Sequence, residues 1–332
     1  MILLTGATGY IGSNLWIKLL KGSTPVIGID NLSNSRVDCL EAISSISSKC
    51  PTFYEGDVRD SKFLSKIFSK FPITHVIHLA ALKDIQTSMI QRGEYFDVNV
   101  RGLKNLLSVM RNHGCRKIIF SSSAAVYGQN LISPIMEASN LTPSNYYGET
   151  KLLGEELLAQ EFYNPFAISS ISLRYFNVAG NHSSGLLFDS AVQSSHSLFS
   201  EIAKVLGGSK AALSIYGGDW ETADGSCIRD YLHVSDLASG HINSLKLLDE
   251  SDGAFVVNLG LGKGQSVYDV ISVFENIVGR VIPKEVTARR AGDVGISYAD
   301  IHRASNLISW SPTKSLENMC IDNLKSSRIN GI

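Results

Sequence analysis

Leu3-Leu4-Thr5-Gly6-Ala7-Thr8-Gly9-Tyr10-Ile11-Gly12 is the stretch of sequence that decides the fold. Apolar residues lead into three glycines, and a segment with helical spacing follows them from Tyr10 to Lys21. Such a turn between a strand and a helix lets a pyrophosphate approach bare backbone amides. The spacing is Gly-x-x-Gly-x-x-Gly, which by itself also fits a tight structural turn.

An acidic residue supports the first interpretation of the turn. Asp30 ends the next apolar run, Pro25 to Ile29, about 20 residues after the glycines. A carboxylate there can bind both ribose hydroxyls and would repel a 2′-phosphate, so NAD is favoured over NADP. Asp57 follows the third apolar run and could accept from the adenine amino group, but a solvated carboxylate at an exposed strand end is an equal alternative.

Short apolar runs alternate with helix-like segments through the first half of the chain. The runs are Met1–Leu4, Pro25–Ile29, Thr52–Tyr54, His75–Leu79, Lys117–Ser121 and Ile168–Leu173. Between them, apolar residues recur at helical spacing in Tyr10–Lys21, Ser61–Lys70, Val98–His113 and Tyr147–Phe162. This alternation is typical of βαβ units, and strands this apolar are covered on both faces. The sequence therefore predicts an α/β fold with a Rossmann-like, doubly wound parallel sheet.

The alternation loosens after Asn177. Stretches rich in Gly and Ser follow at Asn181–Ser184 and Gly217–Gly225, and Phe255–Leu259 has the composition of one more strand. We expect residues 1–177 to form an NAD-binding domain to which residues 232–262 return. Residues 178–231 and 263–332 are expected to form a smaller, mixed α/β substrate-binding cap.

Composition excludes several classes of protein. The chain has 332 residues, 44% hydrophobic and 18% charged, with a formal net charge of -1, which is the profile of a globular protein without a basic footprint for nucleic acid. No apolar run reaches the length of about 18 residues that crosses a bilayer. The five cysteines are scattered and never form Cys-x-x-Cys, so neither a disulfide framework nor a zinc site is indicated. We expect a cytoplasmic protein with no membrane and no nucleic-acid partner.

A proton-handling site is indicated by Tyr147 and Lys151. Their spacing of four places the phenol and the ammonium on one face of a helix, where the cation is expected to lower the phenol pKa and so favour a base. Ser121-Ser122-Ser123 follows a predicted strand, and a hydroxyl there could relay the proton. Alone, each piece is common on ordinary helices and turns. Their order behind a dinucleotide turn favours a catalytic site.

Further motifs accompany the glycine turn and the Tyr147–Lys151 pair. They are Asp30–Ser35, Glu55–Arg59, His78–Lys83, Ser121–Gly128, Arg174–Asn177, Arg229–Val234, Asp236–Ala238, Asn258–Gly260 and Arg289–Asp293. With them the chain resembles the extended short-chain dehydrogenase/reductase family, and most closely the UDP-glucose (UDP-galactose) 4-epimerases, over nearly its whole length.

The resemblance implies a role for each matching position. Tyr147 would be the base, supported by Lys151 and Ser123, and both Tyr147 and Lys151 would also contact NAD. The other cofactor contacts implied are Gly6, Gly9, Tyr10, Ile11, Gly12, Asp30, Asn31, Asn34, Ser35, Asp57, Val58, Leu79, Ala80, Lys83, Asn99 and Phe176. The nucleotide sugar would be bound by Ser123, Asn177, Ser197, Leu198, Tyr216, Arg229, Arg290, Asp293 and Ser297. A homodimer through Val98–His113 and Tyr147–Phe162 is also implied.

The reaction implied is an inversion at the sugar C4. Tyr147 as phenolate takes the 4-hydroxyl proton while hydride passes from C4 to the nicotinamide. The 4-keto sugar, tethered by its diphosphate to Arg229 and Arg290, turns over and receives both back on its other face. NAD should stay tightly bound, because its release would strand the intermediate.

Related activities and a non-catalytic role are the alternatives. Sugar-nucleotide dehydratases of the family carry acidic residues after the serines, where this chain has Ala124 and Ala125, which cannot move a proton. A decarboxylase or a reductase acting on another nucleotide sugar stays open. A non-catalytic NAD-sensing protein is disfavoured by the intact Ser123, Tyr147 and Lys151.

Two departures from the family pattern concern the substrate. Ser297 stands where many relatives have an aromatic residue, which makes UDP-N-acetylglucosamine and UDP-N-acetylgalactosamine candidates beside the plain UDP-hexoses. His196-Ser197-Leu198 replaces the usual Asn-Asn-Leu, which puts that contact in doubt, and Ser197 could supply one hydrogen bond. We expect no metal site: His75, His78 and His233 lie in or beside apolar runs and are interpreted as structural.

Overall fold

A large parallel sheet forms the centre of the molecule in the computed structural model, which describes residues 1–129, 132–187, 197–290 and 292–327. Its seven strands lie in the order β10-β6-β5-β4-β1-β2-β3. Their bounds are Ile2–Thr5 (β1), Val26–Asp30 (β2), Thr52–Glu55 (β3), His75–His78 (β4), Lys117–Ser123 (β5), Ser169–Tyr175 (β6) and Ala254–Leu259 (β10). All neighbouring strands pair in parallel. The predicted Rossmann-like doubly wound sheet is confirmed.

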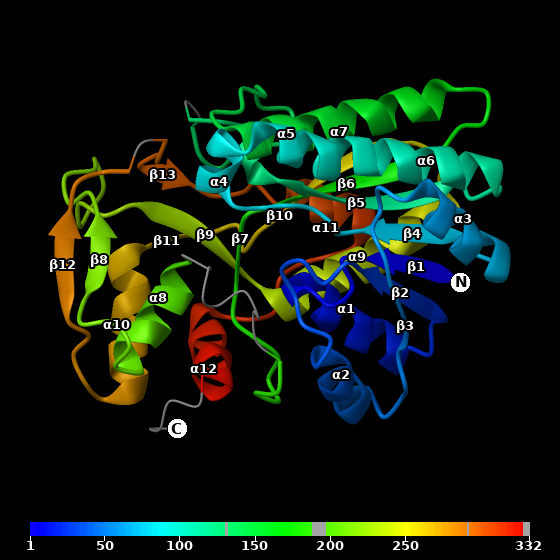
Figure 1. Cartoon of the computed structure of the whole chain (residues 1–332). Coiled ribbons are helices and arrows are strands. Elements are labelled where there is room, and N and C mark those ends of the chain that lie inside the picture. Colours follow the sequence, from blue (N-terminus) through cyan, green and yellow to red (C-terminus); the bar gives the residue numbers. More distant parts are fainter. Residues whose placement is uncertain (130–131, 188–196, 291, 328–332) are drawn as a thin grey trace.

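Helices cover both faces of this sheet (Figure 1). One face carries α1 (Tyr10–Lys21), α2 (Cys39–Ser47) and α9 (Val234–Glu250), and the other carries α3 (Ser61–Lys70), α6 (Gly102–Asn112) and α7 (Tyr146–Tyr163). Each layer buries its own apolar cluster, around Trp16 on the first face and Phe120 on the second. The strand order reverses between β1 and β4, and ligands of such sheets bind at the carboxyl ends of the strands beside that point.

Helix boundaries follow the local sequence closely. The observed α1 and α3 have the predicted bounds, and the side chain of Asp60 caps α3 by accepting from Lys62 N and Phe63 N. The helix predicted from Val98 to His113 instead begins as a π-helical turn, Phe96–Arg101, that continues into α6. Such turns often occur at functional sites. The short helices α4 (Ile85–Ile90) and α5 (Arg92–Tyr95) precede it.

The second half of the chain adds a smaller mixed layer. Strands β7 (Asn177–Ala179), β9 (Ile228–His233), β11 (Gly264–Ser266) and β13 (Ile296–Ser297) form one small sheet, and β8 (Leu213–Tyr216) pairs with β12 (Lys284–Thr287). The helices here are α8 (Leu198–Leu206), α10 (Val267–Val278) and α12 (Leu316–Ser326), which pack around Phe274. The predicted smaller C-terminal α/β unit is confirmed.

One C-terminal segment packs with the large sheet. Helix α11 (His302–Ile308) and Trp310 lie in the same apolar cluster as β1 and β10, and the indole nitrogen of Trp310 donates to Asp236 O at 3.0 Å. We therefore propose the predicted two-domain division with a refinement, in which residues 302–310 join the NAD-binding domain. The physical reason is that α11 covers the sheet beside α9.

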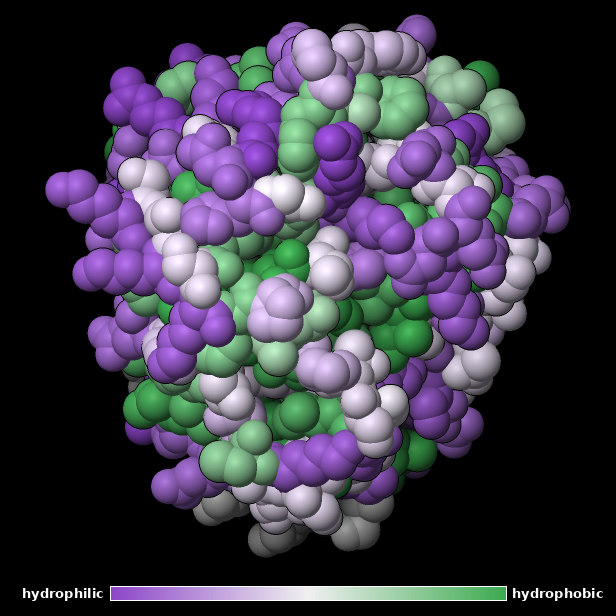
Figure 2. All heavy atoms as spheres, turned by 90° about the vertical axis from the view of Figure 1, so that its right-hand side faces the viewer, coloured by the Kyte–Doolittle hydropathy of each residue, from purple (hydrophilic) through white to green (hydrophobic). Residues whose placement is uncertain are grey.

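The surface mixes polar and apolar groups. Figure 2 shows the face at the right-hand side of Figure 1, where hydrophilic residues surround smaller hydrophobic patches. Among the residues that the structure describes, no helix has the length and apolar character needed to cross a membrane.

Candidate active site

The glycine turn brings three chain segments into contact. Gly6 has φ +68°, and a Cβ there would lie 2.7 Å from the nitrogen of Ala80, after β4. A Cβ on Gly12 would lie 2.1 Å from the carbonyl oxygen of Gly6. Gly9 is the N-cap of α1 and has no side chain to bond the first amides of the helix. An anion such as a pyrophosphate, placed at this end of α1, would meet backbone amides and the positive end of the helix dipole.

Asp30 closes the turn from the side of β2. The carboxylate is buried and accepts from Thr8 N at 3.1 Å, Leu32 N at 2.9 Å and Ser35 Oγ at 3.2 Å. Two carboxylate oxygens offer about four acceptor positions, so the fixed group keeps room for a further donor. A phosphate beside this buried charge would be repelled, in agreement with the preference for NAD over NADP.

Asp57, expected to face the adenine amino group or solvent, has partners within the chain. Its oxygens accept from Arg59 N at 2.8 Å, Nε at 3.0 Å and Nη2 at 2.7 Å, and from Asn31 Nδ2 at 2.8 Å. These bonds, the Arg59 side chain first, lower the pKa of Asp57 to about 2. The four acceptor positions are thus in use, and Arg59, which the sequence analysis missed, shares this part of the wall.

The three serines that end β5 have three different partners. Ser121 O accepts from the Lys151 ammonium at 2.7 Å. The hydroxyl of Ser122 donates to the buried carboxylate of Glu155. Ser123 hydrogen-bonds the phenol of Tyr147. Of the three, only Ser123 is therefore placed to support the proposed base directly.

Tyr147 and Lys151 lie together on α7 as the spacing predicted. The side chain of Asn145 caps this helix by accepting from Gly148 N at 2.9 Å, which fixes its first turn. The Lys151 nitrogen is 5.7 Å from the centre of the Tyr147 ring, and Lys151 is 2% exposed.

The expected lowering of the phenol pKa is wrong for the chain alone. Burial raises the pKa of Tyr147 to about 12, and the hydrogen bond with Ser123 opposes this only in part. Burial also lowers the pKa of Lys151 to about 7, opposed by the charge of Glu155. The physical reason is that the ammonium donates to Ser121 O and faces the flat side of the phenol ring, so it does not outweigh desolvation.

One cavity of about 1930 Å³ joins the glycine turn to these side chains. Its lining includes most of the predicted cofactor residues, namely Gly6, Gly9, Tyr10, Ile11, Gly12, Asp30, Asn31, Asn34, Asp57, Val58, Leu79, Ala80, Lys83 and Phe176. Ser123, Tyr147 and Lys151 line it as well. A site for a dinucleotide and a proton-handling group are therefore parts of the same space, and the residues fit an NAD molecule.

Two predicted cofactor residues, Ser35 and Asn99, do not line the cavity but contact residues that do. Ser35 bonds Thr8 Oγ1 at 2.6 Å and donates to Asp30. The Asn99 amide holds Leu82, accepting from its nitrogen at 2.8 Å and donating to its oxygen at 3.0 Å. Both side chains are buried and each bonds a lining residue, Asp30 for Ser35 and Leu82 for Asn99, so they hold the wall in position.

The predicted substrate residues divide in a similar way. Asn177, Ser197, Arg290 and Asp293 line the cavity, and Arg290 donates to Asp293 at 3.1 Å and lies 4.3 Å over the ring of Tyr216. Leu198, Tyr216, Arg229 and Ser297 do not line it. Arg229 is held beside the wall, with Nη2 3.9 Å from an Asp293 oxygen, and Ser297 is its register partner. His196 and Ala291 lie outside the described residues.

Further parts of the wall could not be expected from the sequence, and two of them are groups of helices. Helices α4 and α5 contribute Ile85, Gln86, Thr87, Met89, Ile90, Glu94 and Tyr95, and helix α12 with its C-terminal neighbour contributes Asn323, Ser326 and Ser327. Local features mark these helices: Asp84 caps α4, and Ser315 with Asn318 forms a capping box at α12. Nothing local shows that they meet the cavity, because that depends on tertiary packing.

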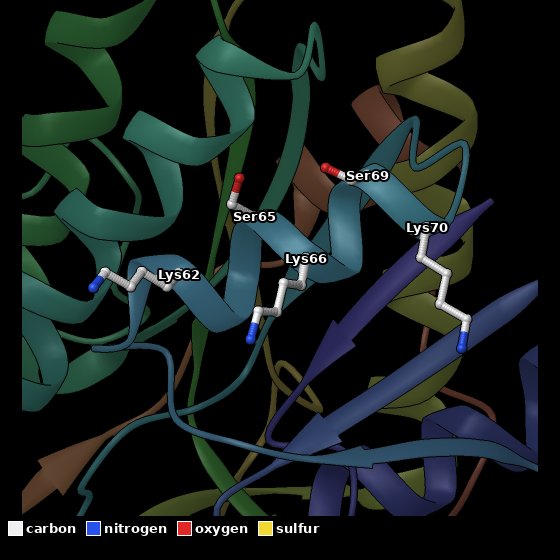
Figure 3. Close-up of a pocket in the computed structure, with 5 residues that line it drawn as sticks. All are labelled: Lys62, Ser65, Lys66, Ser69 and Lys70. Atoms are coloured by element: carbon white, nitrogen blue, oxygen red, sulfur yellow. The ribbon is translucent and has the colours of Figure 1, made fainter.

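A second, smaller hollow of about 570 Å³ lies on the outer side of α3 (Figure 3). Its lining is confined to that helix and consists of Lys62, Ser65, Lys66, Ser69 and Lys70. Figure 3 shows Lys62, Lys66 and Lys70 extending away from one another. The Lys70 ammonium donates to Tyr54 Oη at 2.8 Å. None of these side chains lines the large cavity, so the hollow has no part in its chemistry.

The histidines interpreted as structural have structural partners. Burial lowers the pKa of His78 to about 3, and its ring is 2.8 Å from Thr5 Oγ1. His75 lies 3.0 Å from Asp249, and His233 accepts from Ser235 N at 3.0 Å to cap α9. Within the described ranges, no group of three or more His, Cys, Asp or Glu side chains could hold a metal ion.

Known proteins are similar to this chain in sequence and in fold. Residues 2–260 match the model of the NAD dependent epimerase/dehydratase family. The chain is 38% identical over 332 residues to the UDP-glucose 4-epimerase of Bacillus subtilis, covering 99% of this chain and 98% of the relative. The solved UDP-glucose 4-epimerase of Bifidobacterium longum, in complex with NAD⁺ and UDP, is 38% identical with a TM-score of 0.94, over 99% of this chain and 98% of that one. The UDP-Glc/GlcNAc 4-epimerase of Campylobacter jejuni is 33% identical with a TM-score of 0.86, over 98% of both chains.

Proposed function

The chain belongs to the NAD-dependent epimerase/dehydratase family, and from this premise we propose that it inverts the C4 hydroxyl of UDP-hexoses as an NAD-dependent 4-epimerase. It is an isomerase, and NAD is its cofactor. One observation carries the proposal: the glycine turn, Tyr147, Ser123 and Arg290 face one cavity. A dinucleotide and a tethered sugar can therefore share the space beside a base.

Each of the site residues named above has a part in the proposed reaction. Tyr147 takes the proton of the 4-hydroxyl and later returns it, and Ser123 holds the phenol oxygen through a hydrogen bond. Lys151, fixed on Ser121 O, supplies positive charge beside the phenol. The glycine turn would hold the pyrophosphate of NAD, and Asp30 would hold its ribose. There NAD would supply an acceptor and donor for the C4 hydrogen with its electron pair, and a positive charge that would favour phenolate.

The direct test is product analysis on four substrates in parallel. Purified protein is expected to convert UDP-galactose into UDP-glucose and UDP-N-acetylgalactosamine into UDP-N-acetylglucosamine without added reductant, with each reverse reaction also measurable by NMR. A dehydrated or decarboxylated product, or no conversion unless a reductant is added, would contradict the proposed function. Ala124 and Ala125, which follow Ser123 in a short 3₁₀ turn, favour inversion over elimination.

We propose that both plain and N-acetylated UDP-hexoses are accepted. The similarity to the UDP-Glc/GlcNAc 4-epimerase of Campylobacter jejuni supports this range. Ser297 supports this range too, because its side chain is small and lies close to the cavity wall. Its register partner Arg229 is 3.9 Å from an oxygen of Asp293, which lines the cavity. Conversion of only one of the two pairs in the assay above would contradict it.

Arg290 is proposed to bind the substrate diphosphate. Its guanidinium is held by Asp293 and stacks on Tyr216, so it presents its remaining donors into the cavity. Arg290→Lys is expected to raise the KM for UDP-galactose about 10-fold by removing the bidentate bonds, with NAD content unchanged. The matched control is Arg289→Lys, since Arg289 stacks 3.9 Å over Trp220 and does not line the cavity. Equal KM values for the two variants would remove Arg290 from the substrate site.

A homodimer and a cytoplasmic location complete the proposal. Helices α6 and α7 lie along one outer side of the molecule (Figure 1). Leu153 and Tyr163 of α7 are exposed. We propose that these helices form the dimer interface. A mass in solution of twice that of the chain would support the dimer. All five cysteines are free, which supports a reducing compartment, and localisation of a tagged chain tests that.

A further inference from the structure

A buried ion pair lies beneath Lys151 and has no part in the chemistry described above. Glu155 and Arg174 are 7% and 3% exposed. Arg174 Nε donates to one oxygen of Glu155 at 2.9 Å, and Nη2 donates to the other at 2.6 Å. This is a bidentate bond between two charges that are both withdrawn from water. An ion pair in such a place costs desolvation, so stability alone is a weak reason for it.

Neighbouring side chains fix the pair in one position. The hydroxyl of Ser122 donates to Glu155, and the third nitrogen of Arg174 donates to Tyr127 Oη at 2.9 Å and to Glu137 O at 3.1 Å. Tyr127 in turn donates to Asn258 Oδ1 at 2.6 Å. The carboxylate of Glu155 therefore cannot turn away from its place on α7.

Glu155 stands one helical turn beyond Lys151, on the same side of α7. The Lys151 ammonium has a hydrogen bond to Ser121 O and lies 5.0 Å from the centre of the Phe120 ring. The charge of Glu155 raises the pKa of Lys151, while burial lowers it to about 7. A buried lysine this close to neutrality is sensitive to any change in nearby charge.

The other titratable groups near Lys151 do not replace this charge. His78 on β4 is neutral, since burial holds its pKa at about 3. On β6, burial raises the pKa of Tyr175, so this phenol stays neutral, and Arg174 is a second cation. Tyr147 is neutral in the chain alone. Within this cluster, the carboxylate of Glu155 is thus the anion that offsets two buried cations.

We propose that Glu155 is a positioning residue for the reaction, whose fixed carboxylate stabilises the positive charge of Lys151 beside Tyr147. The proposal rests on the proposed function for its catalytic meaning. Removing the carboxylate would leave Lys151 and Arg174 as uncompensated buried cations, and of the two only lysine can readily lose its proton. Lys151 would then be neutral at the pH at which Tyr147 needs a cation.

The test follows Lys151 directly by NMR of protein labelled with ¹³Cε-lysine, with the Lys151 resonance assigned by its loss in Lys151→Arg. Glu155→Gln is expected to lower the midpoint of the Lys151 titration by about one pH unit, a tenfold loss of proton affinity. The alkaline limb of kcat/KM for UDP-galactose should move down by the same amount. The matched control is Tyr127→Phe, which removes one bond to Arg174 and keeps every charge, and its midpoint should stay in place.

A second variant covers the case in which Glu155→Gln does not fold. Glu155→Gln/Arg174→Gln removes both charges of the pair, and the Lys151 midpoint should still fall, by less than in Glu155→Gln, because the loss of the Arg174 cation offsets part of the loss of the carboxylate that acts on Lys151. An unchanged midpoint in whichever variant folds would overturn the proposal, as would an equal fall in Tyr127→Phe. Failure of the proposed function is distinguishable, because it would abolish conversion of UDP-sugars and leave the NMR titration as described.

Discussion

Tyr147→Phe is expected to lower kcat by about 10²- to 10⁴-fold, the range typical for loss of a general acid–base group. The phenol oxygen is the atom that takes and returns the substrate proton, and the ring alone cannot replace it. The ring of phenylalanine still fills the same place in the wall beside Lys151, so the variant should fold and keep its NAD. Activity assays together with the NAD content of the purified variant check both parts.

The neighbouring tyrosine provides the matched control. Tyr146 lies on the same turn of α7, but its ring stacks with Arg92 at 4.6 Å and does not line the cavity. Tyr146→Phe should therefore retain the activity of the unmodified chain within about twofold. If Tyr147→Phe is as active as Tyr146→Phe, another group must move the proton and the assigned base is wrong.

Gly12→Ala is expected to weaken NAD binding by about 100-fold and to lower activity with it. A Cβ at this position would stand 2.1 Å from Gly6 O and 2.9 Å from Ala7 O, both in the backbone of the turn. Backbone atoms cannot yield as a flexible side chain can, so α1 must move away from the turn. A strain of about 3 kcal/mol, at the upper end for overpacking, corresponds to this loss of affinity.

Calorimetric titration of the NAD-depleted protein with NAD measures this loss of affinity. A Gly→Ala change in another helix serves as the control for effects of the substitution that do not involve the turn. A Cβ on Gly93 in α5 would meet nothing within 4 Å, so Gly93→Ala should bind NAD as the unmodified chain does. Tight NAD binding by Gly12→Ala would show that the turn does not hold the pyrophosphate.

Local chemistry made the dinucleotide half of the fold predictable. The bounds of α1 and α3 follow directly from the glycine turn and from the Asp60 cap. The spacing of Tyr147 and Lys151 also places both side chains at one cavity, since four residues complete about one helical turn. Such features depend on few neighbours in the sequence, and for that reason they can be inferred without the structure.

Tertiary partners account for what the sequence could not show. Asp57 bonds Arg59 and Asn31, and the buried Ser35 and Asn99 bond the lining residues Asp30 and Leu82. The phenol pKa of Tyr147 is set mainly by burial, which the spacing of Tyr147 and Lys151 does not reveal. The contributions of α4 and α12 to the wall likewise arise from long-range packing.

The fate of the hydrogen on C4 tests the central claim most directly, because the claim is that this hydrogen leaves the sugar and returns to the same carbon. UDP-galactose carrying deuterium at C4 is converted in ordinary water, and the UDP-glucose formed is analysed by NMR. Full retention of deuterium at C4 is predicted, since a hydrogen transferred with its electron pair does not exchange with solvent. Replacement of the deuterium by solvent hydrogen would contradict the account.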